Sequence, residues 1–357
     1  MKLKKETVFL RTYGDTDFIT GLRAVAATMV VMIHTAALSE FGAIGQAITS
    51  AGKYGVDIFF VISGFTIAKT FTEARNYSSY LTRRIMRIVP LYWLAITLAM
   101  LLIVVGALPF PYWMQELGSE PNLYNYLMHL SMASFLDYKV ANSVLGVEWT
   151  IPIEVFWYVF LPPLLYFAKT VYRTIGAFVF FHFLSKFLFG ISEDMFGTVL
   201  PITWSPAAHG EMFFIGATSF YLRARFKTEP PAGSGLWIGG AVALFALALV
   251  AGSGRASEAL AFSTAILIVC VTPDRAKWVT RPLTSRPMLF LGSISYSLYL
   301  FHLPIMSLLG ELNLLPGFGL AKFMLVYGTT VVVSMATYAL VEKPTNRLGL
   351  RLALGAK

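Results

Sequence analysis

The sequence predicts an all-α membrane protein, a polytopic helical bundle of about ten transmembrane helices. Hydrophobic residue types make up 57% of the 357 residues and charged types only 13%, whereas a soluble domain carries about 25% charged residues. Apolar runs long enough to span a bilayer recur from one end of the chain to the other. The composition also excludes a disordered chain, and the single cysteine excludes a disulfide framework and a cysteine-ligated zinc site.

Each predicted span is one of the long apolar segments of the chain. They are Phe18–Leu38, Tyr54–Phe71, Pro90–Gly106, Trp149–Phe167, Ile175–Phe189, Ala207–Leu222, Leu236–Ala251, Glu258–Thr272, Met288–Gly310 and Leu320–Val341. An eleventh segment, Asn122–Leu136, is short and semi-polar. Because runs of about 10–14 residues are often interfacial or re-entrant, we expect this segment to be a short extracytoplasmic element that does not span.

The distribution of Lys and Arg orients the predicted bundle. With ten spans and a cytoplasmic N-terminus, the cytoplasmic side contains 23 of the 28 Lys and Arg residues, and counting the eleventh segment as a span breaks this pattern. Basic residues collect on the cytoplasmic side of membrane proteins. The net charge of +9 is therefore explained without nucleic-acid binding, and both termini are predicted to be cytoplasmic.

Residues 1–357 are expected to form a single membrane domain. No apolar core precedes Phe18 and no small-residue cleavage site follows the first span closely, which favours an uncleaved first helix over a signal peptide. We expect no appended soluble domain at either end. The stretch Glu229–Gly235, rich in Pro, Gly and Ser, is interpreted as a loop.

The first span contains two ionisable residues, Arg23 and His34, and such residues are functional candidates because a bilayer penalises charge. They are 11 residues apart, so at about 100° per residue they return to within about 20° of one helix face, about 16 Å apart along the axis. Each also has an ordinary explanation. Arg23 can extend to the interface, and His34 can be a packing residue.

Three further ionisable residues lie toward the outer ends of their predicted spans. Asp57 is placed near the outer mouth of the second span, where it is either functional or an interfacial acid. Glu154 lies among aromatic residues, where a carboxylate needs a partner. Cations are few on this side, so His34 or a substrate is the expected partner. His302 ends a Ser- and Tyr-containing run of the ninth span.

Arg83, Arg84 and Arg87 precede the third span, and Arg84 and Arg87 share a helix face. Two interpretations remain open. One is a positive-inside anchor; the other is a cytoplasmic anion-binding clamp, since guanidinium forks match phosphate geometry and a nucleotide-bearing donor would suit them. The sequence has no metal-ligand spacing, P-loop or hydrolase motif, so no metal site is predicted.

Six stretches, taken in order, resemble the acyltransferase family 3 of integral membrane proteins. They are GLRAVAATMVVMIH at Gly21–His34, GVDIFFVISGF at Gly55–Phe65, RRIMRIVPLYW at Arg83–Trp93, WTIPIEVFWY at Trp149–Tyr158, SYSLYLFH at Ser295–His302 and VEKP at Val341–Pro344. Each motif alone is weak, but all six in order are specific, and they cover the chain from the first span to the last.

The resemblance implies an enzyme of the inner (plasma) membrane that O-acylates, and usually O-acetylates, an extracytoplasmic glycan such as a lipopolysaccharide O-antigen or an exopolysaccharide. Acetyl-CoA on the cytoplasmic side would be the donor substrate, with no bound cofactor. The family's arginine–histidine pattern falls on Arg23 and His34, and its R-x-x-R motif on Arg84 and Arg87. Its tryptophan-to-glutamate motif falls on Trp149 and Glu154.

These positions give a set of expected roles. Arg23, Arg84 and Arg87 would bind the donor. His34 would act as a general base on the acceptor hydroxyl or as a transient acyl carrier, and Glu154 or Asp57 would orient its imidazole. Acceptor-side candidates are Trp149 and His302.

Other functions are weighed against this one. A polysaccharide or lipid-linked glycan flippase without acyl transfer would also have ten spans and internal charges, but it would more often show internal repeats. Membrane acyltransferases with a late His and Asn form a second class, and the His in the first helix argues against them. Acylation of a small-molecule acceptor is a third alternative.

Overall fold

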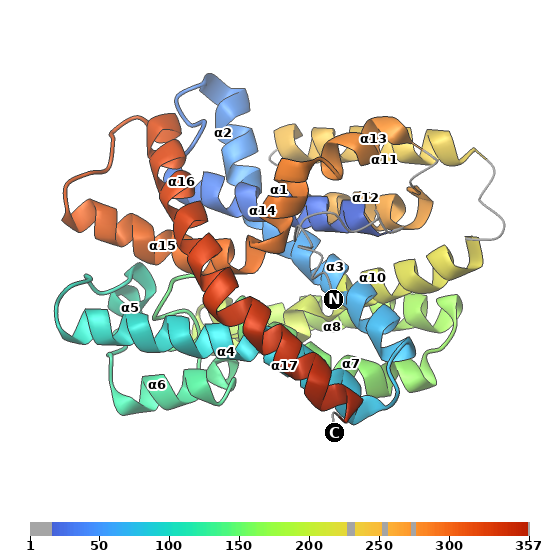
Figure 1. Cartoon of the computed structure of the whole chain (residues 1–357), viewed down its shortest axis with the longest axis horizontal. Helices are drawn as coiled ribbons and strands as arrows, with labels where there is room; N and C mark the ends of the chain where they lie inside the picture. Colours follow the sequence, from blue (N-terminus) through green and yellow to red (C-terminus); the bar gives the residue numbers. More distant parts are fainter. Residues whose placement is uncertain (1–15, 227–232, 252–255, 273–275, 356–357) are drawn as a thin grey trace, which may run out of the picture.

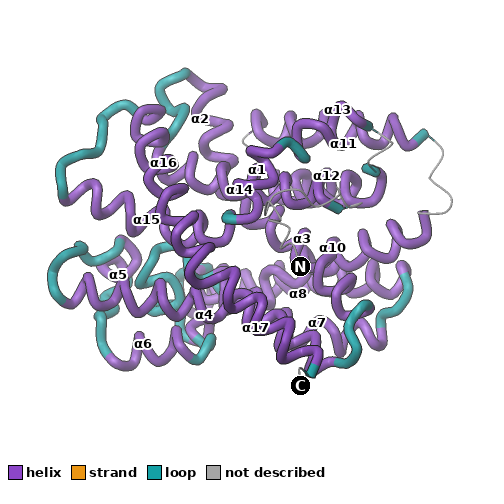
Figure 2. The backbone as a smooth tube through the Cα atoms, in the orientation of Figure 1, coloured by secondary structure: helices purple, strands orange, loops and turns teal. Residues whose placement is uncertain are grey.

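The structure, a computed structural model, describes residues 16–226, 233–251, 256–272 and 276–355 (Figure 1). Within these ranges the regular elements are helices, and no β-strand occurs (Figure 2). Both chain termini, which were predicted to be cytoplasmic, lie outside the described residues, as does most of the predicted loop Glu229–Gly235.

The helices vary in length from a single turn to 28 residues. In chain order they are α1 (Asp17–Thr35), α2 (Gly42–Ser50), α3 (Gly55–Thr72), α4 (Tyr77–Val104), α5 (Tyr112–Glu116), α6 (Leu123–Leu130), α7 (Thr150–Phe167), α8 (Val171–Phe196), α9 (Leu200–Thr203), α10 (Pro206–Phe226), α11 (Ser234–Ala251), α12 (Ala256–Cys270), α13 (Lys277–Leu283), α14 (Arg286–Ser293), α15 (Ser295–Glu311), α16 (Gly319–Thr337) and α17 (Lys343–Leu354).

Seven helical segments in the described part of the chain are long and apolar enough to cross a membrane, or eight if α14 and α15, bent by 69°, form one span. The predicted polytopic helical bundle is therefore confirmed as a fold class. Two of the ten predicted spans, on α10 and α12, are outside this count, and α12 has only 15 residues. The eleventh segment forms the short helix α6 and a 3-10 turn.

Helix α1 runs through the centre of the bundle and packs against α3, α14, α15 and α16. Gly292 of α14 lies against the carbonyl oxygen of Thr20 on α1. Gly21 of α1 lies against the carbonyl oxygen of Leu283, the last residue of α13, and a Cβ on either glycine would collide with the carbonyl it faces. Gly64 on α3 and Gly216 on α10 make the same kind of contact. Small residues allow such crossings in membranes, so these two glycines let α3 and α10 approach closely.

Helix α4 begins at a capping residue, Asn76, whose side chain accepts a hydrogen bond from the Ser79 N–H at 2.8 Å. The helix continues through Pro90. Helix α17 lies along α4 (Figure 1), where Gly349 allows close contact with Met86. This packing brings α17 beside the arginine cluster of α4.

The two ends of the bundle carry different connections. In Figure 1 the connections that follow α4 and α15 lie on the left, and those that follow α3 and α7 lie on the right. The distribution of basic residues predicts that the left end is the outer side and the right end is the cytoplasmic side.

Candidate active site

Two histidines meet where the last turn of α1 packs against α15. The His34 Nδ1 atom is 2.8 Å from the carbonyl oxygen of Val30 and 3.1 Å from the Nε2 atom of His302. His302 is fully buried, and its Nδ1 atom is 2.7 Å from the carbonyl oxygen of Tyr299. The two rings are 5.0 Å apart between centroids.

These contacts fix where the protons of the neutral pair lie. A carbonyl oxygen can only accept, so His302 must carry its proton on Nδ1 and present an Nε2 lone pair. His34 Nδ1 must then carry a proton, which it donates to Val30 and His302. The Nε2 atom of His34 is left with a free lone pair, which suits a general base or a nucleophile.

His34 lines a cavity of about 340 Å³, which we call the histidine cavity. Its walls come from α1, α5, α15 and the turn before α7. The lining includes Trp113, Leu145, Leu303 and Ser307. A cavity of this volume falls in the range of small-molecule sites.

A second, narrower space, the central cavity, has a volume of about 70 Å³. It is lined by Arg23, Arg84, Arg87 and Glu154, together with apolar residues of α3. One Glu154 oxygen accepts hydrogen bonds from Ser63 at 2.5 Å and Tyr158 at 2.6 Å. Three guanidinium groups and one carboxylate give this cavity an excess of positive charge.

The third space, the arginine cavity, has a volume of about 230 Å³. It shares Thr66, Arg84 and Arg87 with the central cavity and is also lined by Arg83 and Asn346 of α17. The two cavities are therefore neighbours, and the arginine pair separates them.

The two arginines of the predicted clamp differ in their surroundings. Arg84 is buried and donates hydrogen bonds to the carbonyl oxygen of Thr66 at 2.8 Å and to the hydroxyl of Thr70 at 2.5 Å. Its guanidinium also lies 5.5 Å from the ring centroid of Tyr158. Arg87 makes no hydrogen bond to any described residue and is only partly buried. Of the two, Arg87 has the donors free for a bound anion.

The structure brings together some of the sequence-predicted residues and separates others. Arg23, Arg84, Arg87 and Glu154 line one cavity, and His34 meets His302. Neither carboxylate that was expected to orient His34 makes a hydrogen bond to it. Glu154 bonds to Ser63 and Tyr158, as described above, and Asp57 accepts from Ser257 of α12 at 2.7 Å.

Trp149, an expected acceptor-side residue, lies elsewhere. Its ring packs against Phe60 of α3 and His209 of α10, with centroids 6.3 and 5.3 Å away. It is not among the residues that line the histidine cavity. Within the described residues, no group of three or more His, Cys, Asp or Glu side chains could hold a metal ion.

The sequence reasoning missed Tyr299. Its hydroxyl accepts from Thr150 at 3.0 Å and donates to the carbonyl oxygen of Val147 at 2.7 Å, and its ring lines the central cavity. Its position three residues before His302 on one helix was the available signal.

Comparison with known proteins identifies the class. A family model described as an acyltransferase domain matches residues 16–339. The chain therefore belongs to the acyltransferase family 3 and is a membrane-embedded O-acyltransferase enzyme.

Two curated relatives are similar along most of the chain. The exopolysaccharide production protein ExoZ of Rhizobium meliloti is 29% identical over 315 residues, which cover 84% of this chain and 90% of ExoZ. The O-acetyltransferase OatA of Staphylococcus aureus is 21% identical over 370 residues, which cover 93% of this chain but only 57% of OatA. No solved structure matches.

Proposed function

We propose that this enzyme transfers an acetyl group from cytoplasmic acetyl-CoA to a hydroxyl group of an extracytoplasmic surface glycan, as a multi-pass protein of the inner membrane. The observation that carries the proposal is the arrangement of cavities, with arginines at one end and the histidine pair at the other. The names of two relatives, one concerned with exopolysaccharide production and one an O-acetyltransferase, support the acceptor class and the acyl group.

The donor is bound from the arginine end. Arg83 and Arg87 face the arginine cavity and pair with the phosphate groups of CoA, while Arg84 holds α4 against α3. The central cavity, at about 70 Å³, is too narrow for a nucleotide but suits a thin flexible chain. The nucleotide therefore remains at the arginine cavity, and only the pantetheine arm enters.

The path proposed for the arm runs alongside α1. Arg23 and His34 are 11 residues apart on one helix, which places them about 16 Å apart along its axis. A pantetheine arm that passes Arg23 in the central cavity thus directs its thioester toward His34. Glu154 lies beside this path and offsets part of the charge of the arginines.

His34 acts as the general base. The acceptor hydroxyl in the histidine cavity gives its proton to His34 Nε2 as its oxygen bonds to the carbonyl carbon of the thioester. The C–S bond breaks, and the leaving thiolate takes the proton from the imidazolium, which yields free CoA. His302 Nε2 accepts a hydrogen bond from His34 Nδ1 throughout, so the ring keeps its orientation.

The function is tested on the surface polysaccharide itself. Mass spectrometry of polysaccharide from cells with and without the gene should show the mass increment of one acetyl group per modified repeat only when the wild-type gene is present. Identical spectra from the two strains would contradict the proposed acceptor class.

The orientation is tested with single cysteines in a Cys270→Ser background and a membrane-impermeant thiol reagent. Cysteines at Glu120 and Asn313, which are both exposed, should be labelled in intact cells, because both positions follow helices that end on the proposed outer side. Cysteines at Ser78 and Thr284 should react only after permeabilisation. Labelling of the Ser78 position in intact cells would reverse the orientation.

A further inference from the structure

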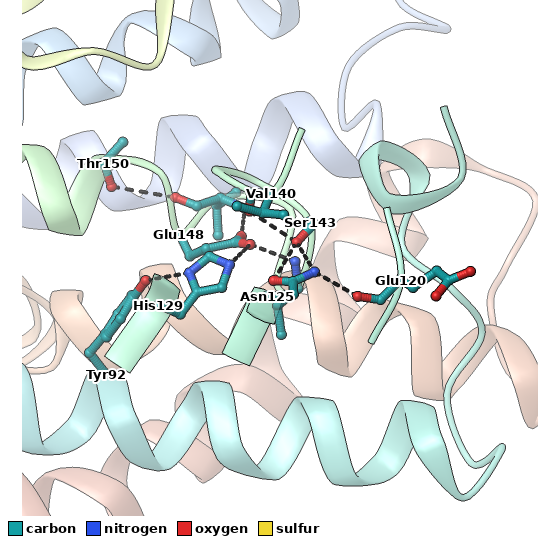
Figure 3. Close-up of polar contacts among 10 residues, drawn as sticks. Tyr92, Glu120, Asn125, His129, Val140, Ser143, Glu148 and Thr150 are labelled. Atoms are coloured by element: carbon teal, nitrogen blue, oxygen red, sulfur yellow. Dashed lines mark hydrogen bonds and ion pairs between the residues drawn. The ribbon is translucent and has the colours of Figure 1, made fainter. Parts of the chain in front are cut away.

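A buried polar network lies beside the histidine cavity and joins Tyr92 of α4, His129 of α6 and Glu148, which precedes α7 (Figure 3). Glu148, His129 and Tyr92 are all fully buried. Apolar residues could fill such a site at lower cost, since burying ionisable groups is unfavourable. None of the three residues lines a cavity described above or forms one of the close glycine contacts between helices. Their burial therefore needs another explanation.

The Glu148 carboxylate holds the turn that precedes it. One oxygen accepts the backbone N–H of Val144 at 2.5 Å, and the other accepts that of Val147 at 3.0 Å. Gly146, between them, has a φ of +81°, which favours glycine. Val144, Leu145 and Gly146 all line the histidine cavity. The carboxylate therefore fixes one wall of the space that His34 faces.

His129 of α6 lies beside this carboxylate. Its Nε2 atom lies 3.8 Å from a Glu148 oxygen and has no hydrogen-bond partner among the described residues, while its Nδ1 atom is 2.8 Å from the Tyr92 hydroxyl (Figure 3). Burial raises the pKa of Glu148 to about 7 and lowers the pKa of His129 to about 4. The ionisable groups that face Glu148 are His129 from α6, Tyr92 from α4 and Tyr299 from α15.

A chain of hydrogen bonds connects the turn to the histidine pair. Glu148 holds the N–H of Val147, and the carbonyl oxygen of Val147 accepts from the Tyr299 hydroxyl. The carbonyl oxygen of Tyr299 accepts from His302, whose other ring nitrogen contacts His34. The Glu148 carboxylate is thus connected to His34 through three intervening residues.

We propose that Glu148 is a positioning residue for the acceptor side of the reaction. It holds the Val144–Val147 turn as a wall of the histidine cavity and, through Val147 and Tyr299, fixes the turn of α15 that carries His302. The proposal rests on the proposed function for the identity of the acceptor. Loss of the carboxylate would displace the acceptor and the histidine pair while leaving the arginine end intact.

The kinetic test compares Glu148→Gln with Glu120→Gln in nanodiscs, with acetyl-CoA and de-O-acetylated surface polysaccharide of the host as probes. Glu120 is exposed in the same outer region, so it is a matched control. We expect Glu148→Gln to lower kcat/KM for the polysaccharide about 10- to 100-fold, because small misplacements of reacting groups have effects of this size. KM for acetyl-CoA should not change.

The assay is run at pH 8 so that a loss of activity in Glu148→Gln is not caused by a loss of stability. Because the pKa of Glu148 is higher in the folded protein than its ordinary value, the carboxyl favours folding at low pH, and this contribution is lost as the pH rises through about 7. At pH 8 the buried carboxyl of the wild type is therefore ionised, which lowers the free energy of unfolding. The Gln variant is uncharged and does not have this destabilising effect. Thermal unfolding of both variants at this pH reports the folded fraction.

A labelling test needs no acyl transfer. With Cys270→Ser and Leu145→Cys, an impermeant thiol reagent should label position 145 at least about tenfold faster when Glu148→Gln is added, because the freed turn exposes it. Addition of Glu120→Gln should have no effect. Kinetics and labelling that match the Glu120→Gln control would overturn the proposal, as would equal losses in donor and acceptor parameters. Absence of acetyl transfer by the wild type would contradict the proposed function, and labelling would still decide the role of Glu148.

Discussion

Replacing His34 with Ala should reduce acyl transfer by about 10²–10⁴-fold, the contribution of a positioned general base. The variant loses the only nitrogen of the histidine pair that has a free lone pair, since His302 uses one ring nitrogen on Tyr299 and the other on His34. The measurement is the acetyl content of surface polysaccharide, together with transfer by purified protein. Expression and membrane insertion should be unchanged.

His182→Ala is the matched control. This histidine on α8 pairs with Glu211 of α10 at 2.6 Å and lines none of the three cavities. Its replacement removes an imidazole from the same bundle without touching the path proposed for the acyl group, so transfer should stay close to the wild-type rate. Near-normal acetylation by His34→Ala would remove His34 from the chemistry.

Replacing Arg87 with Ala should raise KM for acetyl-CoA about 10- to 100-fold, because a charge-assisted contact to phosphate contributes about 1.5–3 kcal/mol. The kinetic parameters of the glycan acceptor should change much less. The single substitution is preferable to a double Arg84 and Arg87 variant, since Arg84 also holds α4 to Thr66 and Thr70 of α3. Initial rates over a range of acetyl-CoA concentrations provide the measurement.

Arg75→Ala serves as the control for charge alone. Arg75 is exposed in the connection between α3 and α4, at the same end of the bundle, and lines neither arginine-containing cavity. If Arg87→Ala left KM for acetyl-CoA unchanged, the R-x-x-R motif would be a topological anchor and the donor would bind elsewhere.

The sequence predicted the individual helices better than the contacts between them. Helix periodicity placed Arg23 and His34 on one face of the first span, and in the structure Arg23 lines the central cavity while His34 lines the histidine cavity. Periodicity describes a helix alone, however. It contains nothing about which helix packs against that face, so the contact of His34 with His302, 268 residues away, could not be derived.

The carboxylates show the same limit. Glu154 was recognised as a charge that needs a partner, but Ser63 and Tyr158 supply its contacts rather than His34. Asp57 accepts a hydrogen bond from Ser257, 200 residues away. Small polar residues carry no pattern that marks them as partners, and their pairing depends on how the helices cross.

The network around Glu148 was beyond sequence reasoning for another reason. Glu148 precedes α7 and belongs to no periodic element, and the two backbone N–H groups it accepts depend on the conformation of a turn. The short segment Asn122–Leu136 that supplies His129 was predicted from its length and polarity, but the contact between His129 and Tyr92 was not predicted.

In the proposed mechanism the acyl group passes through the protein from one side of the membrane to the other. This transfer is tested most directly in proteoliposomes with labelled acetyl-CoA outside and de-O-acetylated polysaccharide either trapped inside or added outside, with His34→Ala as the blank. In either orientation, the inserted protein places its donor site and its acceptor site on opposite faces of the bilayer. Labelled polysaccharide should therefore form only when donor and acceptor are separated by the bilayer. Equal labelling when both are outside sealed vesicles would contradict transfer through the protein.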